Sequence, residues 1–157
     1  MAIERVLMKQ PREGILEHFQ DRIYEILRSK NDFLPLFIVG DKRSNFEAFC
    51  ERLAVDGIGE GLFIRPPLPR RIIENVPGPV YEQIDFSIQI VENILTNRTG
   101  RSAILIAEKV AALLHLYEMN CGGQRWTIAC RTKDPWTFEG DVHRNMIAVH
   151  FTTMGCV

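Results

Sequence analysis

The sequence lacks the motifs that usually announce enzymatic chemistry. Its 157 residues contain no glycine-rich phosphate loop, no cluster of metal ligands and no nucleophile motif. The four cysteines, Cys50, Cys121, Cys130 and Cys156, show no CxxC spacing and no small secreted framework around them. We therefore expect a reduced intracellular chain with no cofactor, no metal and no catalytic residue.

The net charge is also small, and long apolar runs are absent. The formal net charge is -1, from 19 Lys and Arg against 20 Asp and Glu, so no overall field favours nucleic acid or an anionic membrane. No segment approaches the roughly 18 apolar residues that span a bilayer, and residues 1–10 lack the long hydrophobic region of a signal peptide. We expect a chain held in the cytoplasm, without a membrane partner or a specific nucleic-acid partner.

What the sequence does contain is a set of clear periodicities within one domain. With 46% hydrophobic and 25% charged residues and no linker or repeat, residues 1–157 are typical of a single soluble unit. Three- and four-residue spacing of apolar side chains predicts helices, and two-residue alternation predicts strands. The expected helices cover about 12–29, 44–54 (opened by a capping box, Ser44 to Glu47) and 102–119, and the expected strands cover 36–40, 62–64, 81–92, 124–131 and 145–153.

The strand over residues 81–92 is the clearest of these elements. Ile84, Phe86 and Ile88 alternate with polar residues, which indicates a strand with one buried face. A polar loop and then an amphipathic helix follow it. We predict an α+β fold, with two main helices packed on one face of a mostly antiparallel sheet and one additional short helix.

A proline-rich segment at about residues 65–80 interrupts this pattern. Proline cannot donate to a strand ladder, so the segment is expected to be a loop, an edge or an arm, in which Ile72 and Ile73 pair locally. An extended passage of roughly fifteen residues in a small domain is often functional. Contact with a neighbouring subunit is one such use.

Two further segments each allow a structural and a functional interpretation. In the polar loop, Asn93 and Asn97 either form side-chain-to-backbone turns or present Arg98 to a partner, and the two roles are compatible. Trp136 and Phe138 fall in an expected loop after Asp134-Pro135. They either fold back on the core as a lid or form an exposed contact.

The order of these elements resembles the small tail proteins of long-tailed bacteriophages. The likeness is to tail terminator, or tail-completion, proteins and the related small tail protein of Mu-like prophages. Its pattern covers residues 76–151 and is concentrated in Val76-Pro77-Gly78-Pro79-Val80-Tyr81 and in the loop from Glu92 to Arg98.

This resemblance implies a structural role without catalysis. Such proteins form a homo-oligomeric ring, a hexamer, that ends the tail tube and joins it to the head. The implied partners are copies of the chain, the tail tube protein and the head–tail connector, and the implied location is the bacterial cytoplasm during assembly and then the virion tail. The candidate interface residues are Arg65, Pro67, Arg70, Arg71, Pro77, Tyr81, Asn93, Asn97, Arg98, Arg101, Trp136 and Phe138.

Two other classes of function stay open at this stage. An intracellular adaptor would hold a partner with the Trp136–Phe138 segment, and its oligomeric state would separate it from a ring protein. A small enzyme would need a cleft in which Cys130, a histidine and a carboxylate converge.

Overall fold

The computed structural model describes residues 14–43, 45–55, 58–68, 71–74 and 80–156. Its helices are α2 (Ile15–Arg28), α3 (Phe46–Val55) and α4 (Ala103–Leu114), with a 3-10 turn, η1 (Asn31–Phe33). Its strands are β1 (Phe37–Gly40), β2 (Glu60–Ile64), β3 (Arg71–Glu74), β4 (Val80–Asn93), β5 (Glu118–Cys121), β6 (Gln124–Cys130), β7 (Trp136–Gly140) and β8 (Arg144–Cys156). The predicted α+β class is confirmed.

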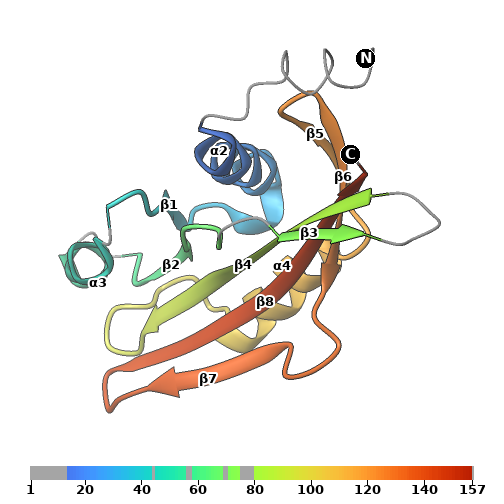
Figure 1. Ribbon diagram of the computed structural model, residues 1–157. Coiled ribbons are helices and arrows are strands. Elements are labelled where there is room, and N and C mark those ends of the chain that lie inside the picture. The colour runs from blue at the N-terminus through green and yellow to red at the C-terminus, as the bar shows by residue number, and fades with distance from the viewer. Residues whose placement is uncertain (1–13, 44, 56–57, 69–70, 75–79, 157) are drawn as a thin grey trace.

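All eight strands form one sheet around the long pair β4 and β8 (Figure 1). This pair runs antiparallel from Tyr81 opposite Cys156 to Asn93 opposite Arg144. Shorter strands extend the sheet on both sides of the pair: β2 and β3 pair with β4, and β6 and β7 pair with β8. The sheet is mixed because β1 runs parallel to β2, whereas every other pairing described is antiparallel.

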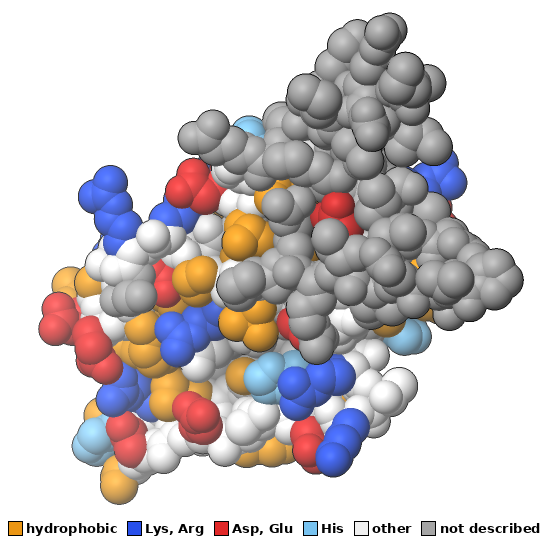
Figure 2. All heavy atoms as spheres, viewed as in Figure 1, with side chains coloured by type: hydrophobic (Ala, Val, Ile, Leu, Met, Phe, Trp, Pro, Cys, Tyr) orange, Lys and Arg blue, Asp and Glu red, His pale blue; other side chains and the backbone are white. Residues whose placement is uncertain are grey.

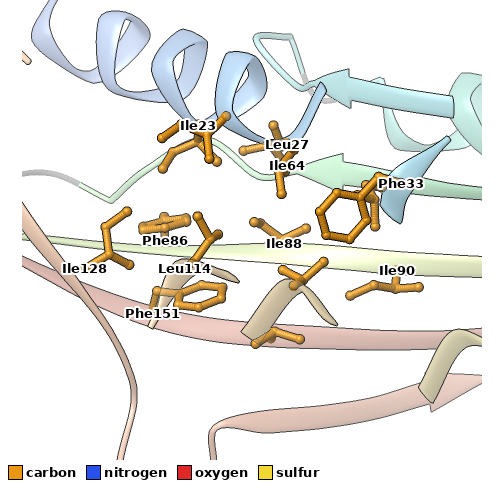
Figure 3. Close-up of a cluster of buried hydrophobic side chains, with 14 of the residues drawn as sticks. Ile23, Leu27, Phe33, Ile64, Phe86, Ile88, Ile90, Leu114, Ile128 and Phe151 are labelled. Atoms are coloured by element: carbon orange, nitrogen blue, oxygen red, sulfur yellow. The ribbon is translucent and has the colours of Figure 1, made fainter. Parts of the chain in front are cut away.

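The core lies on one face of this sheet and follows from alternation along the central strands. Phe86 and Ile88 on β4 are buried there, and side chains from α2 and α4 join the same apolar cluster. In Figure 3, Ile23 and Leu27 of α2 and Leu114 of α4 are drawn among the buried side chains around β4. Both helices therefore contribute to the core formed by the alternating face that the sequence predicted.

A smaller cluster occupies the opposite face near β2. It joins Phe49 and Leu53 of α3 to Phe63 and Val91, which point away from the main core. At the start of α3, Asp41 Oδ1 accepts the backbone N–H groups of residues 43 and 45. The expected capping serine, residue 44, lies outside the described residues.

Two predictions of secondary structure were wrong. The helix expected to reach residue 119 ends at Leu114, because the next backbone groups pair with β6: Leu116 donates to the Ile128 carbonyl, and Ile128 donates to the Tyr117 carbonyl. The segment expected to be a loop before the last strand is strand β7, which pairs with the first part of β8. In both places, pairing with a strand that follows along the chain overrides the local pattern.

The described parts of the proline-rich segment lie along the chain's own β4. Arg65 donates its backbone N–H to the Ser87 carbonyl, and Leu68 donates to the Asp85 carbonyl. Pro67, between them, is half-buried. The backbone of β3 then pairs with residues 80–83 of β4. Arg70 and Pro77 lie outside the described residues, and of Arg71 only the backbone is described.

We expect the aromatic contact between α2 and the sheet to contribute strongly to stability. Phe19 is fully buried, with its ring edge-on to Phe86 at 5.3 Å and to Trp126 at 6.1 Å between centroids. Replacing it (Phe19→Ala) should lower the free energy of unfolding by about 3–5 kcal/mol, because the ring's burial is lost and a cavity remains. Urea denaturation followed by circular dichroism measures the change.

The matched control is His18→Ala, at the exposed neighbouring position on the same helix. It should change the free energy of unfolding by less than about 0.5 kcal/mol. Equal effects of the two substitutions would contradict the packing of α2 described above.

Candidate functional site

The candidate residues of the polar loop lie at one end of the central pair, between β4 and α4. Asn93 Oδ1 accepts the backbone N–H of Leu95, which closes a turn. Asn97 donates to Glu92 Oε2 at 2.6 Å and to the Arg101 carbonyl at 2.9 Å, and its Oδ1 accepts the Thr99 N–H. Both asparagines therefore hold the loop's conformation, as the structural interpretation predicted.

Two arginines of this loop differ in their contacts. Arg101 donates through its guanidinium to the carbonyl oxygens of Asp32 and Leu34, so it fastens the start of α4 to the segment before β1. The backbone N–H of Arg98 donates to the Ile58 carbonyl, and the side chain of Arg98 is exposed. Of the two, Arg98 is the one presented to solvent.

Beneath the loop lies a pair of carboxylates that the sequence did not single out. Glu60 on β2 is directly opposite Glu92 on β4, and Glu60 is fully buried. Thr99 donates to Glu60 Oε1 at 3.1 Å, while Glu60 Oε2 has no hydrogen-bond partner within the part of the chain that is described. Burial, with the nearby Glu92 charge adding to it, raises the pKa of Glu60 to about 7, against the opposing effects of Thr99 and Arg101.

Of the two aromatic candidates, Trp136 folds back on the core and Phe138 is exposed. Trp136 packs against the main core, whereas Phe138, with its ring centroid 6.2 Å from that of Trp136, is 64% exposed. Phe138 borders a hollow of about 390 Å³ that it shares with Ile104 at the start of α4 and with Glu92. Trp136 is therefore part of the packing, and Phe138 is exposed at the surface.

Exposed apolar side chains continue around this end of the sheet. The loop is tied to the β7–β8 turn because the backbone N–H of Ile94 donates to the His143 carbonyl. We call this surface the apolar end. Its exposed members are Ile94, Leu95, Ile104, Phe138 and Val142. Large side chains exposed together in this way are typical of an interaction surface.

The remaining candidate, Tyr81, lies at the other end of β4. It is half-buried and pairs with β3 and with the last residues of β8. The structure thus separates Tyr81 and the Arg65–Leu68 segment from the apolar end, which contains the loop and Phe138. The other exposed side chains of the apolar end could not be grouped from the sequence, because they come from three separate segments and share no periodic pattern.

Cys130 and His115, which were considered for enzymatic chemistry, both form hydrogen bonds with the backbone. Cys130 donates its thiol to the Ala111 carbonyl at 3.8 Å, and burial raises the pKa of this thiol. His115 accepts the backbone N–H of Cys130 through Nδ1. Among the residues that the structure describes, no three His, Cys, Asp or Glu side chains are grouped so as to hold a metal ion.

Comparisons with known proteins add a fold but no function. No family model matches the chain, and no curated protein matches its sequence. One solved structure, whose name describes no function, is similar with 13% identity and a TM-score of 0.53. The match covers 92% of this chain and 94% of the other, so the α+β arrangement is shared along nearly its whole length. At this identity, the likeness shows the fold alone.

The buried Glu60 makes stability depend on pH. Because its pKa is raised in the folded state, its favourable contribution is complete below the ordinary glutamate pKa of about 4.3 and is lost as the pH rises to about 7. The substitution Glu60→Gln keeps an acceptor for Thr99 and removes the charge. We expect this variant to exceed the natural chain in free energy of unfolding at pH 8 by on the order of 1 to 3 kcal/mol.

Urea unfolding at pH 5 and pH 8 measures this difference. The control variant Glu108→Gln changes an exposed carboxylate on α4 and should follow the pH profile of the natural chain. If Glu60→Gln still lost stability between the two pH values as the natural chain does, Glu60 would not be the group responsible.

The loop allows a second comparison between adjacent residues. Asn97→Ala should lower the free energy of unfolding by about 2 kcal/mol, because it removes the hydrogen bonds of Asn97 to the Arg101 carbonyl and to Glu92 and leaves the Thr99 N–H without its acceptor. Arg98→Ala should leave stability nearly unchanged. Thermal unfolding of both variants measures the difference, and a greater loss for Arg98→Ala would overturn the assignment of roles.

Proposed function

We propose that this protein is a structural subunit that assembles with copies of itself into a ring, as in the tail terminators that its sequence resembles. In this role it ends a phage or prophage tail tube and joins the tube to the head. The observation that carries the proposal is the apolar end, where exposed Phe138 on an edge strand borders the same hollow as exposed Ile104. An edge strand with exposed apolar side chains favours association with another chain.

The charge distribution supports a protein partner. In Figure 2, acidic, basic and apolar side chains are interspersed over the described part of the visible face, without one large field of a single sign. Mixed charge of this kind suits contact between protein subunits better than contact with the phosphates of nucleic acid. The tail tube protein and the head–tail connector are the further partners that the proposal includes.

A role as an intracellular adaptor is the second candidate, and the hollow beside Phe138 favours it. A partner's side chain could bind between Phe138 and Ile104, next to the carboxylate of Glu92. An adaptor of this kind binds its partner as a monomer or dimer. The oligomeric state therefore separates the two functions.

The test is the solution mass by light scattering at several protein concentrations, with negative-stain images of the same samples. We expect closed ring particles, which identical head-to-tail contacts form when the rotation between copies closes. Their mass should be about six chains, the number that the resemblance to tail terminators implies. A monomer or dimer at every concentration, with no rings in the images, would contradict the proposal and favour the adaptor.

A further inference from the structure

The edge of β7 presents unpaired backbone groups to solvent. Within the β7–β8 pair, His150 donates to the Pro135 carbonyl and Asp141 donates to the Arg144 carbonyl. Since hydrogen-bonded residues alternate along an antiparallel pair, the odd-numbered residues of β7 bond to β8 and the even-numbered ones point outward. The outward N–H and C=O groups are therefore those of Trp136, Phe138 and Gly140. Among the described strands, β7 pairs with β8 alone.

The opposite margin of the sheet is β1, which has an outward edge of the same kind. Asp41 donates its backbone N–H to the Ile64 carbonyl, so the odd-numbered residues of β1 face β2. The backbone groups of Ile38 and Gly40 then point outward. All four residues of β1 are half-buried, as expected for a strand at a margin.

The directions of these two strands suit one another. β1 runs parallel to β2, and three successive antiparallel pairings lead from β2 through β4 and β8 to β7. β7 is therefore antiparallel to β1. If a second copy continues the sheet in the same sense, its β1 meets β7 as an antiparallel neighbour, the arrangement with the better hydrogen bonds.

The side chains at the two margins are also complementary. Phe138 lies opposite Ile147, on the core face of the sheet, and it is exposed. On the same face beside β1, a hollow of about 240 Å³ is bordered mainly by apolar side chains, among them Leu34 and Ile38, with exposed Arg28 also in its lining. Leu34 is itself 59% exposed. Each margin thus has an apolar element that matches the other: a projecting ring on β7 and a hollow beside β1.

From these observations, we propose that β7 of one copy pairs antiparallel with β1 of the next, with Phe138 entering the hollow beside Ile38. This inference rests on the proposed self-assembly and specifies its interface. Placing Phe138 opposite Ile38 sets Trp136 opposite Gly40 and Gly140 opposite Leu36, so in these two flanking pairs a large side chain meets a glycine. It also sets Glu139 opposite Phe37.

A charge pair on the other face agrees with this register. The guanidinium of Arg52 lies over the Phe37 ring, 4.4 Å from its centroid. Glu139 is exposed on β7, and the proposed register brings its carboxylate to this guanidinium. The contact joins two different surfaces, so it is head-to-tail and generates a closed ring when the rotation between copies closes.

The test is a disulfide placed across the proposed pair. Thr137 and Val39 face each other in this register at a position without backbone hydrogen bonds, where the Cα atoms of an antiparallel pair are about 4.5 Å apart, within the range that a disulfide spans. The double variant Thr137→Cys, Val39→Cys should give a ladder of covalent oligomers on a non-reducing gel under mild oxidation. Each single variant should give none beyond the natural chain.

The outcomes separate this inference from the proposed function. Ring particles without a ladder would overturn the β7–β1 pairing and leave self-assembly standing. A covalent dimer from Thr137→Cys alone would mean that β7 pairs with its own counterpart, which also overturns the inference. A monomer at every concentration, with no ladder, would overturn both.

Surface variants keep the test decisive if the cysteine variants fold poorly. Phe138→Asp should reduce the assembled fraction at least about ten-fold, because the burial of the ring against Leu34 and Ile38 is lost and a surface ion pair with exposed Arg28 contributes little in its place. The matched control Val55→Asp changes a side chain that is 82% exposed on α3, and it should assemble as the natural chain does. Glu139→Arg should also weaken assembly, and adding Arg52→Glu should restore it. Unchanged assembly of Phe138→Asp would overturn the inference.

Discussion

The antiparallel pairing of β4 with β8 is the constraint on which the rest of the structure depends. It sets which residues of both strands face the core, because a shift by one residue would turn every side chain of a strand to the other face. The strand β8 is also longer than either strand on its other side. It pairs with β7 over residues 145–149 and with β6 over residues 151–155. The short strand β7 is consequently left at a margin of the sheet, with its other edge exposed.

The pairing of β4 with its other neighbour, β2, explains the chemistry of the polar loop. The β2–β4 register places Glu60 directly against Glu92, and the turn that follows β4 supplies Thr99 and Asn97 to these carboxylates. A buried carboxylate without a full set of donors is costly when charged, which is why the pKa of Glu60 rises. The loop thus combines a fixed interior, held by its asparagines, with exposed Ile94 and Leu95 at its surface.

Much of the fold could be predicted because its strongest signals are local. Alternation in β4 and β8 and the apolar stripe of α2 each lie within one continuous segment. The failures occur where distant residues decide: Tyr117 fits the helical stripe of α4, yet its carbonyl pairs with Ile128 on β6. The Glu60–Glu92 pair depends on the register of strands far apart in the chain, which a single sequence does not reveal. For β7, the alternation of Trp136 and Phe138 with Thr137 and Glu139 was a usable signal, but the strand is short.

The proposed self-assembly through an exposed strand edge accounts together for the apolar end, the marginal position of β7 and the hollow beside β1. Amide hydrogen exchange, compared at low and high protein concentration, tests this account most directly. The account predicts that the outward amides of Phe138 and Ile38 become protected as the concentration rises. The amide of Leu68, which donates to the Asp85 carbonyl within its own chain, should not change. Assembly that leaves the amides of Phe138 and Ile38 unprotected would contradict it.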